Sequence, residues 1–92
     1  MIKTAADKRT ARFLAGERVK EFAAYADQAN KRLRILKNAR SVEELQALPS
    51  DRLEALSGNR KGQYSIRINR QWRVCFEFVK GDAYDVEIVD YP

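Results

Sequence analysis

Hydrophobic residues recur with two different periods along this chain, and the change of period divides it into two parts. Between residues 19 and 39 they recur at steps of three and four, at Val19, Phe22, Ala26, Ala29, Leu33 and Leu36. On a helix this spacing places all of them on one stripe, and charged residues cover the remaining surface. The pattern therefore predicts one long helix over residues 19–39 that packs through its apolar stripe.

Two shorter helices are expected on either side of this one. Residues 5–15 are predicted to be helical up to Gly16, which suits a left-handed C-terminal cap. Further on, "SVEEL" matches a capping box: the Ser41 hydroxyl accepts from the amide of Glu44, and the Glu44 carboxylate accepts from the amide of Ser41. We expect a third helix over residues 42–48, ended by the proline that follows it.

After Pro49 the hydrophobic period falls to two, which is typical of half-buried strands. The segments "YSIRINR", "WRVCFEFV" and "AYDVEIVDY" alternate cleanly and are rich in aromatic and β-branched residues, whereas "DRLEAL" predicts a weaker strand. This order predicts an α+β fold, in which two to three N-terminal helices pack on one face of a small antiparallel sheet. A length of 92 residues favours a single domain, residues 1–92.

The register of the two strongest strands follows from their buried face. A connection of three residues pairs Ile68 with Trp72 and keeps the apolar side chains of both strands on one side of the sheet. The same register sets Arg67 directly across from Arg73 on the other side. Facing like charges cost a few tenths to about 1 kcal/mol. Either both side chains extend into solvent, or the pair holds an anion such as a phosphate.

The final strand brings further polar residues to the arginine face. A three-residue loop over residues 80–82 sets Val89 beside Arg73. Alternation then carries Tyr91 to the arginine face and Asp90 to the inner face. Three carboxylates are expected to gather toward the other end of the arginine face, where we expect no cation: Glu77, Asp85 and Glu87.

A basic turn is expected to add cations near the two arginines. Arg60 and Lys61 lie between glycines in "LSGNRKGQY". Most such turns only connect strands. Together with Arg67 and Arg73, however, these cations can contact successive phosphates of an RNA strand.

Charge is distributed unevenly between the two parts of the chain. The net charge is +5, yet residues 1–40 carry eleven cations against four anions, a balance of +7. A basic helical half suggests a polyanion or an acidic protein as a partner. The alternative is a solvated helix surface with spare lysines.

Composition excludes several functional classes. Cys75 is the single cysteine and histidine is absent, so an internal disulfide is impossible and a zinc site is not expected. We expect no metal and no cofactor. No apolar run is long enough to span a membrane, and the N-terminus lacks the apolar core of a secretory signal. These features favour a cytoplasmic protein without a membrane partner.

The second part of the chain resembles a known family. The run "LEALSGNRKGQYSIRINRQWRVCFEF" is similar to the pattern L-x-G-[DN]-R-x-G-x-[WY]-S-I-x-[VI]-N-x-x-W-R-[IV]-x-F-x-F, and "GDAYDVEIVDYP" is similar to G-D-A-Y-x-[VL]-x-[IY]-x-D-Y-H. Both patterns are those of HigB-type toxins of the RelE/ParE superfamily. The resemblance implies a compact, microbial-RNase-like toxin that cleaves mRNA on the translating ribosome. It also implies a HigA-like helix-turn-helix antitoxin, and operator DNA bound through the antitoxin complex.

The resemblance also implies which residues form the site. Five positions match functional residues of the family: Arg73, Asp90, Tyr91 and, in the basic turn, Arg60 and Lys61. Both histidines of the family are replaced. Glu54 stands at the first of these positions and Pro92 at the second. Arg67 joins the predicted site through the register alone.

Cleavage of RNA by its own 2′-hydroxyl needs charge stabilisation and two proton transfers. We hypothesise that Arg73, aided by Arg67, stabilises the phosphorane, while Tyr91 and either Asp90 or Glu54 handle protons. Glu54 is equally suited to a structural ion pair, and Asp90 to a hydrogen bond that orients Tyr91 or fixes the chain end.

A second functional hypothesis follows from the missing histidines. In it the chain is a superfamily member without ribonuclease activity. Such a protein either inhibits gyrase or is a weakened toxin that acts mainly in the antitoxin complex and in operon repression.

Overall fold

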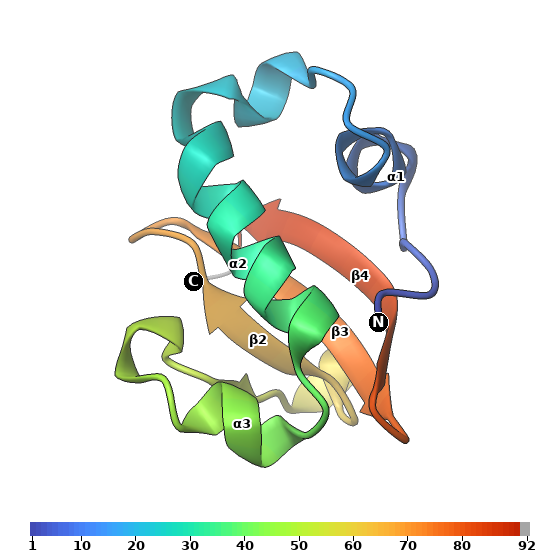
Figure 1. Ribbon diagram of the computed structural model, residues 1–92, viewed down its shortest axis with the longest axis vertical. Coiled ribbons are helices and arrows are strands. Elements are labelled where there is room, and N and C mark those ends of the chain that lie inside the picture. Colours follow the sequence, from blue (N-terminus) through green and yellow to red (C-terminus); the bar gives the residue numbers. More distant parts are fainter. Residues whose placement is uncertain (91–92) are drawn as a thin grey trace.

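The computed structural model describes residues 1–90 and confirms the predicted α+β fold. Four strands form an antiparallel sheet in the order β1-β2-β3-β4, and α2 crosses one face of it (Figure 1). The elements are α1 (Lys8–Leu14), the 3₁₀ helix η1 (Lys20–Tyr25), α2 (Ala26–Asn38), α3 (Val42–Gln46), η2 (Pro49–Asp51), β1 (Glu54–Ala55), η3 (Gly58–Arg60), β2 (Tyr64–Arg67), β3 (Trp72–Val79) and β4 (Asp82–Asp90). Within residues 1–90, no helix has the length and apolarity that crossing a bilayer requires.

The predicted single helix over residues 19–39 is in fact two elements. Its first part is the 3₁₀ helix η1, and the backbone of Tyr25 (φ −129°, ψ 25°) separates η1 from α2. Aromatic packing explains the difference, because residues three apart share one side of a 3₁₀ helix. Phe22 and Tyr25 are both buried. The ring of Phe22 packs edge-on against that of Phe13, with 5.5 Å between ring centroids, and the ring of Tyr25 stacks on that of Trp72, with 5.1 Å between centroids.

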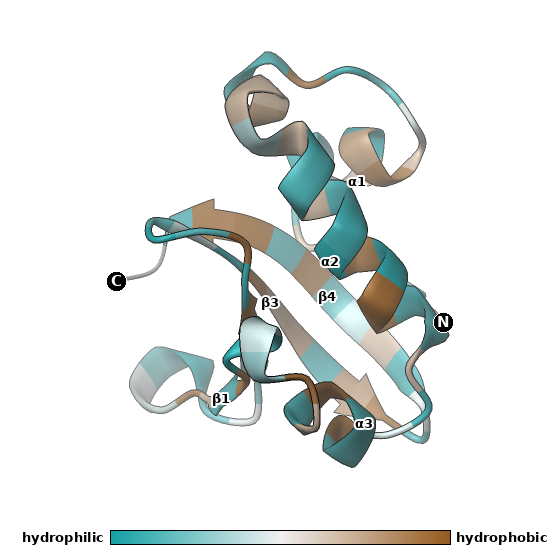
Figure 2. Cartoon of the chain, turned by 60° about the vertical axis from the view of Figure 1, so that its left-hand side comes forward, coloured by the Kyte–Doolittle hydropathy of each residue, from teal (hydrophilic) through white to brown (hydrophobic). Residues whose placement is uncertain are grey.

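The core lies between the helices and the inner face of the sheet. Buried residues of α2 meet the alternate, buried residues of β2, β3 and β4, and the colours along β4 in Figure 2 show the alternation of apolar and polar positions. The central members are Ala29, Leu33, Leu36, Ile66, Val74, Phe76, Val86 and Ile88. Full burial of one such large side chain stabilises the fold by about 1.5–3 kcal/mol. The predicted division of the sheet into an inner and an outer face is therefore confirmed.

The cap of α3 differs in one bond from the predicted capping box. The Ser41 hydroxyl accepts from the amide of Glu44 at 3.2 Å, as expected. The Glu44 carboxylate, however, accepts from the amide of Arg40 at 3.1 Å and not from that of Ser41. The helix also ends at Gln46, before the predicted residue 48, because Leu48 precedes a proline and adopts an extended backbone.

The turn between β3 and β4 has two residues, so the predicted three-residue loop is wrong. Lys80 and Gly81 both have positive φ, at 50° and 84°, as a tight hairpin turn requires. The ladder then contains a bulge, in which Asp85 takes a φ of 52° and β4 gains one residue relative to β3. This extra residue restores the predicted pairing of Arg73 with Val89.

The free edge of β4 is covered by the N-terminal segment and α1. Ile2 and Ala5 form parallel bridges with β4, and the residues on either side of each bridge exchange backbone hydrogen bonds with Ala83 and Val86. Further along the same edge, the fully buried Thr10 of α1 accepts a hydrogen bond from the amide of Ile88 at 3.1 Å. This hydroxyl satisfies an edge amide that has no access to water.

We therefore expect Thr10→Val to lower the free energy of unfolding by about 1–3 kcal/mol, since the amide of Ile88 loses its partner while it stays buried. Urea denaturation measures this change. Thr4→Val is the matched control, because Thr4 accepts from the amide of Asp85 at an exposed position where water can replace the hydroxyl. Equal losses for the two variants would contradict the proposed role of burial.

Candidate active site

The side chain of Arg73 links three strands on the outer face of the sheet. From β3, its Nη1 donates to the hydroxyl of Ser65 on β2 at 3.1 Å. Its Nη2 donates to Oε1 of Glu54 on β1, also at 3.1 Å, and forms an ion pair there. The side chain of Arg73 is 17% exposed and that of Glu54 is 56% exposed. The guanidinium is therefore fixed against the sheet, and solvent reaches it from the side of Glu54.

Arg67 faces Arg73 across the strand pair, as the sequence predicts. Its Nε donates to the carbonyl oxygen of Asn69 at 3.0 Å. The side chain of Asn69 accepts from the amides of Gln71 and Trp72 at 2.9 Å and 2.8 Å, and so fixes the turn that sets this register. The facing arginines are thus held by different acceptors, Arg73 by Glu54 and Arg67 by a backbone carbonyl.

The middle of the outer face is buried, which the sequence did not predict. Cys75 and Ser65 have no exposed surface. Burial raises the pKa of the Cys75 thiol, while the nearby charges of Arg60 and Arg73 lower it and that of Glu87 raises it. The thiol is therefore protonated at neutral pH, and as a buried thiol it is not a candidate nucleophile.

Arg60 lies with the carboxylates that were expected to have no cation, so that prediction is wrong. Its Nη2 contacts Oε1 of Glu87 on β4 at 2.9 Å, and its Nη1 donates to Oε1 of Gln63 at 3.0 Å. The reason is the η3 turn, which brings Arg60 over the outer face. Lys61, the next residue, is exposed. The basic turn therefore supplies one cation held in an ion pair and one directed to solvent.

Asp90 lies on the inner face beside Trp72, as the alternation predicts. Its Oδ2 accepts from Nε2 of Gln71 at 3.0 Å. Its charge also contributes to the pKa of Tyr25, which burial raises to about 12, against the lowering effect of Arg9. Asp90 is thus on the face opposite Arg73. The two predictions for Tyr91 and Pro92 concern positions outside the described residues.

The structure thus assembles part of the predicted site and adds members to it. Arg73, Glu54 and Arg67 share one end of the outer face. Sequence analysis missed Ser65, although its alternation with Arg67 places it on this face. It also missed Gln63, for which the sequence carries no comparable signal because the contact depends on how η3 folds back. A guanidinium held by a carboxylate and a hydroxyl, beside a second arginine, is suited to bind a phosphate.

Comparison with known protein families identifies the family of this chain. Residues 3–91 match the sequence profile of the family described as the RelE-like toxin of type II toxin-antitoxin system HigB. This chain belongs to the HigB family of toxins. The match spans almost the whole chain, so it includes the helical half and the sheet with its arginines.

Two similar proteins support the assignment of this chain to the HigB family. Endoribonuclease HigB of Proteus vulgaris is 37% identical over 65 residues, which cover 71% of this chain and 70% of the relative. Toxin HigB-1 of Vibrio cholerae serotype O1 is 43% identical over 53 residues, which cover 58% of this chain and only 56% of the relative.

Solved structures support the fold of this HigB-family toxin. Two structures of the YoeB-YefM complex from Staphylococcus aureus superpose with TM-scores of 0.63 and 0.61, at 17% and 18% identity. Each comparison covers 100% of this chain, and 95% and 98% of the respective neighbour. At this identity the likeness concerns the fold alone.

We expect Glu54→Gln to tighten the binding of inorganic phosphate about two- to fivefold, because the carboxylate that neutralises Arg73 is exposed and worth about 0.5–1 kcal/mol. Titration followed by NMR chemical shifts measures the affinity. Glu43→Gln, at an exposed carboxylate of α3, is the control and should leave it unchanged. Weaker phosphate binding by Glu54→Gln would contradict an anion site at Arg73.

Proposed function

We propose that this HigB-family toxin cleaves mRNA on the translating ribosome and thereby inhibits translation in the cytoplasm. The observation that carries the proposal is the guanidinium of Arg73, which is held by Ser65 and Glu54 but stays open to solvent on one side. The family and the activity named for the Proteus vulgaris relative support the same function.

The proposed reaction is an internal transesterification of RNA. The 2′-oxygen attacks the adjacent phosphorus, loses its proton and forms a new O–P bond, while the bond from phosphorus to the 5′-oxygen breaks and that oxygen gains a proton. Charge accumulates on the phosphorane between these events. A fixed donor at such a position is typically worth 10²- to 10³-fold in rate. Arg73 supplies this donor, and Arg67 supplies a second cation across the strand pair.

Glu54 serves in this mechanism to position Arg73. Its carboxylate accepts from Nη2 at 3.1 Å while the Ser65 hydroxyl accepts from Nη1, so the two acceptors fix the direction of the guanidinium. Asp90 fixes the end of β4 through Gln71. Tyr91, which lies outside the described residues, is proposed to handle a proton. The exposed Lys61, with Arg60, is proposed to contact the RNA backbone.

Two further partners belong to the proposal. A HigA-like antitoxin with a helix-turn-helix domain is proposed to inhibit the toxin, and the complex of both proteins is proposed to bind operator DNA. One of the two Staphylococcus aureus structures is of a YoeB-YefM toxin-antitoxin complex, which supports this part of the proposal.

A second candidate function rests on one observation, the complete absence of histidine. Without the usual proton carriers of the family, the chain would be a gyrase-inhibiting toxin or a weakened toxin retained for antitoxin binding and operon repression.

Tightly controlled expression, followed by mapping of mRNA 5′ ends with and without translation, separates these functions. We expect codon-phased cuts that require translation, and we expect Arg73→Ala to reduce them at least about 100-fold. Arg70→Ala is the matched control, because Arg70 is an exposed arginine in the neighbouring turn. Growth arrest with intact mRNA and a DNA-damage response would indicate gyrase inhibition instead.

A further inference from the structure

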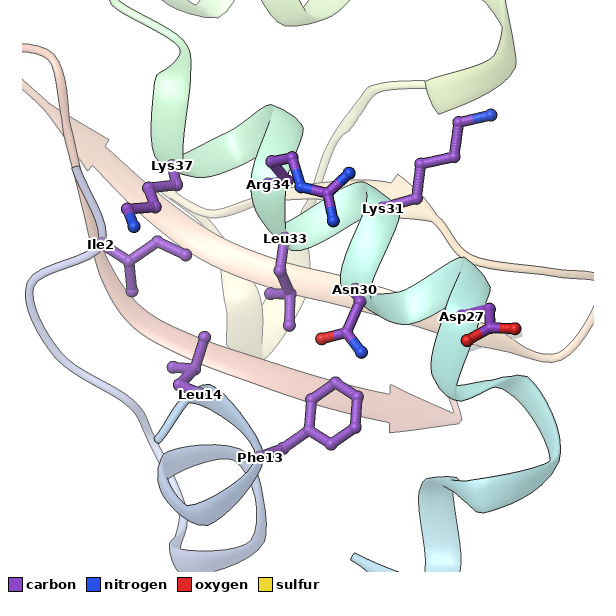
Figure 3. A pocket seen from close by; sticks show the side chains of 9 residues that line it. All are labelled: Ile2, Phe13, Leu14, Asp27, Asn30, Lys31, Leu33, Arg34 and Lys37. Atoms are coloured by element: carbon purple, nitrogen blue, oxygen red, sulfur yellow. The ribbon is translucent and has the colours of Figure 1, made fainter. Parts of the chain in front are cut away.

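A groove runs between α1 and α2, on the side of the molecule that carries the helices. It encloses about 630 Å³, and Figure 3 shows the side chains of its floor pointing into the space between the two helices. The floor is apolar and consists of Ile2, Phe13, Leu14 and Leu33. Two of these, Ile2 and Leu14, are only half buried. The groove therefore offers apolar surface that the chain itself does not cover.

Two smaller hollows extend the groove at its ends. One, of about 420 Å³, shares Ile2, Leu14 and Lys37 with the main groove. The other, of about 270 Å³, shares Phe13 with it. The main groove alone follows α2 from Asp27 to Lys37. Ten residues of helix rise about 15 Å, so this stretch matches roughly three turns of a second helix laid alongside.

The rim of the groove is basic on balance, because three cations line it beside one carboxylate, Asp27, and none of these cations forms an ion pair within residues 1–90. The three cations, Lys31, Arg34 and Lys37, line it from α2, spaced three residues apart. Three of the five other arginines in residues 1–40 are paired: Arg9 with Glu21, Arg12 with Glu17 and Arg32 with Asp51. The excess of +7 in residues 1–40 is thus concentrated partly on this rim.

The apolar floor and the basic rim together indicate which kind of molecule the groove binds. A nucleic-acid backbone would pair with the rim, but it has no apolar groups for a floor of aliphatic and aromatic side chains. An amphipathic helix supplies both, with apolar residues at steps of three and four and carboxylates on the flanking positions. Carboxylates spaced three or four residues apart would meet Lys31, Arg34 and Lys37 in turn.

We propose that the groove between α1 and α2 binds an acidic amphipathic helix of the antitoxin. The identity of this partner rests on the proposed function, whereas the chemistry of the helix rests on the groove. Arg73 lies on the opposite face of the sheet, because it alternates with the inward-facing Trp72 and Val74. The proposed antitoxin-binding groove and the phosphate site therefore lie on different surfaces of the molecule.

The test measures the affinity between the purified chain and the helix-turn-helix protein encoded beside it, by calorimetry. We expect the triple variant Lys31→Glu, Arg34→Glu, Lys37→Glu to weaken this affinity at least about 100-fold. A second variant, Leu14→Arg, places a charge over the apolar floor and should weaken binding comparably. Circular dichroism and thermal unfolding confirm that each variant is folded.

The control carries the same change of charge away from the groove, as Lys8→Glu, Lys20→Glu, Arg70→Glu. All three are exposed positions, and we expect less than a threefold change in affinity. The groove variants should also retain mRNA cleavage on ribosomes, which a structural defect or a loss of RNA contact would not allow.

Each other outcome contradicts the inference and shows which part of it fails. If the unaltered chain binds the antitoxin and the triple variant binds it equally well, the groove is not the interface, while the proposed function stands. Should the variants lose cleavage but keep antitoxin binding, the groove contacts RNA. If the unaltered chain cleaves mRNA but does not bind the neighbouring protein, the antitoxin part of the proposed function fails together with the inference.

Discussion

The hydrogen bonds of the Arg73 guanidinium are the interaction on which the candidate site depends. One side chain from β3 reaches Ser65 on β2 and Glu54 on β1, so three of the four strands meet at its two terminal nitrogens. β1 has only two residues, Glu54 and Ala55, and this ion pair adds a side-chain link to its short backbone ladder. The arrangement requires the register that sets Arg67 across from Arg73. That register is fixed by the buried face of the strands and by the Asn69 turn.

Much of this arrangement could be predicted from the sequence, for identifiable physical reasons. The β2–β3 register follows from alternation and turn length, because any slip by one residue would expose the apolar face. The pairing of Arg73 with Val89 was also predicted, but the strands reach it by another path. The turn is one residue shorter than expected, and the bulge at Asp85 adds the missing residue back to β4. Periodicity carries no information about such a bulge. It likewise could not place Arg60 against Glu87, because that contact depends on how a short 3₁₀ turn folds across the sheet.

The two faces of the sheet have different chemistry. In the proposed function, RNA cleavage takes place on the outer face and the antitoxin binds on the side of the helices. The inner face carries the core, with the aromatic cluster of Phe22, Tyr25 and Trp72 where the predicted long helix breaks. Beyond that core, the helices form the groove with the basic rim, which is the proposed binding surface for a partner. The outer face holds the arginines. Asp90, which the family pattern associates with the site, lies on the inner face and accepts a hydrogen bond from Gln71, so we propose that it fixes the end of β4.

In the proposed mechanism Glu54 acts through Arg73 and not as an independent proton carrier. A double-mutant cycle tests it most directly, with single-turnover cleavage of mRNA on purified, programmed ribosomes as the measured rate. We expect Glu54→Ala to slow cleavage when Arg73 is present but to change the rate less than about twofold in the Arg73→Ala background, since nothing then remains to be positioned. An equal fractional loss in both backgrounds would contradict it.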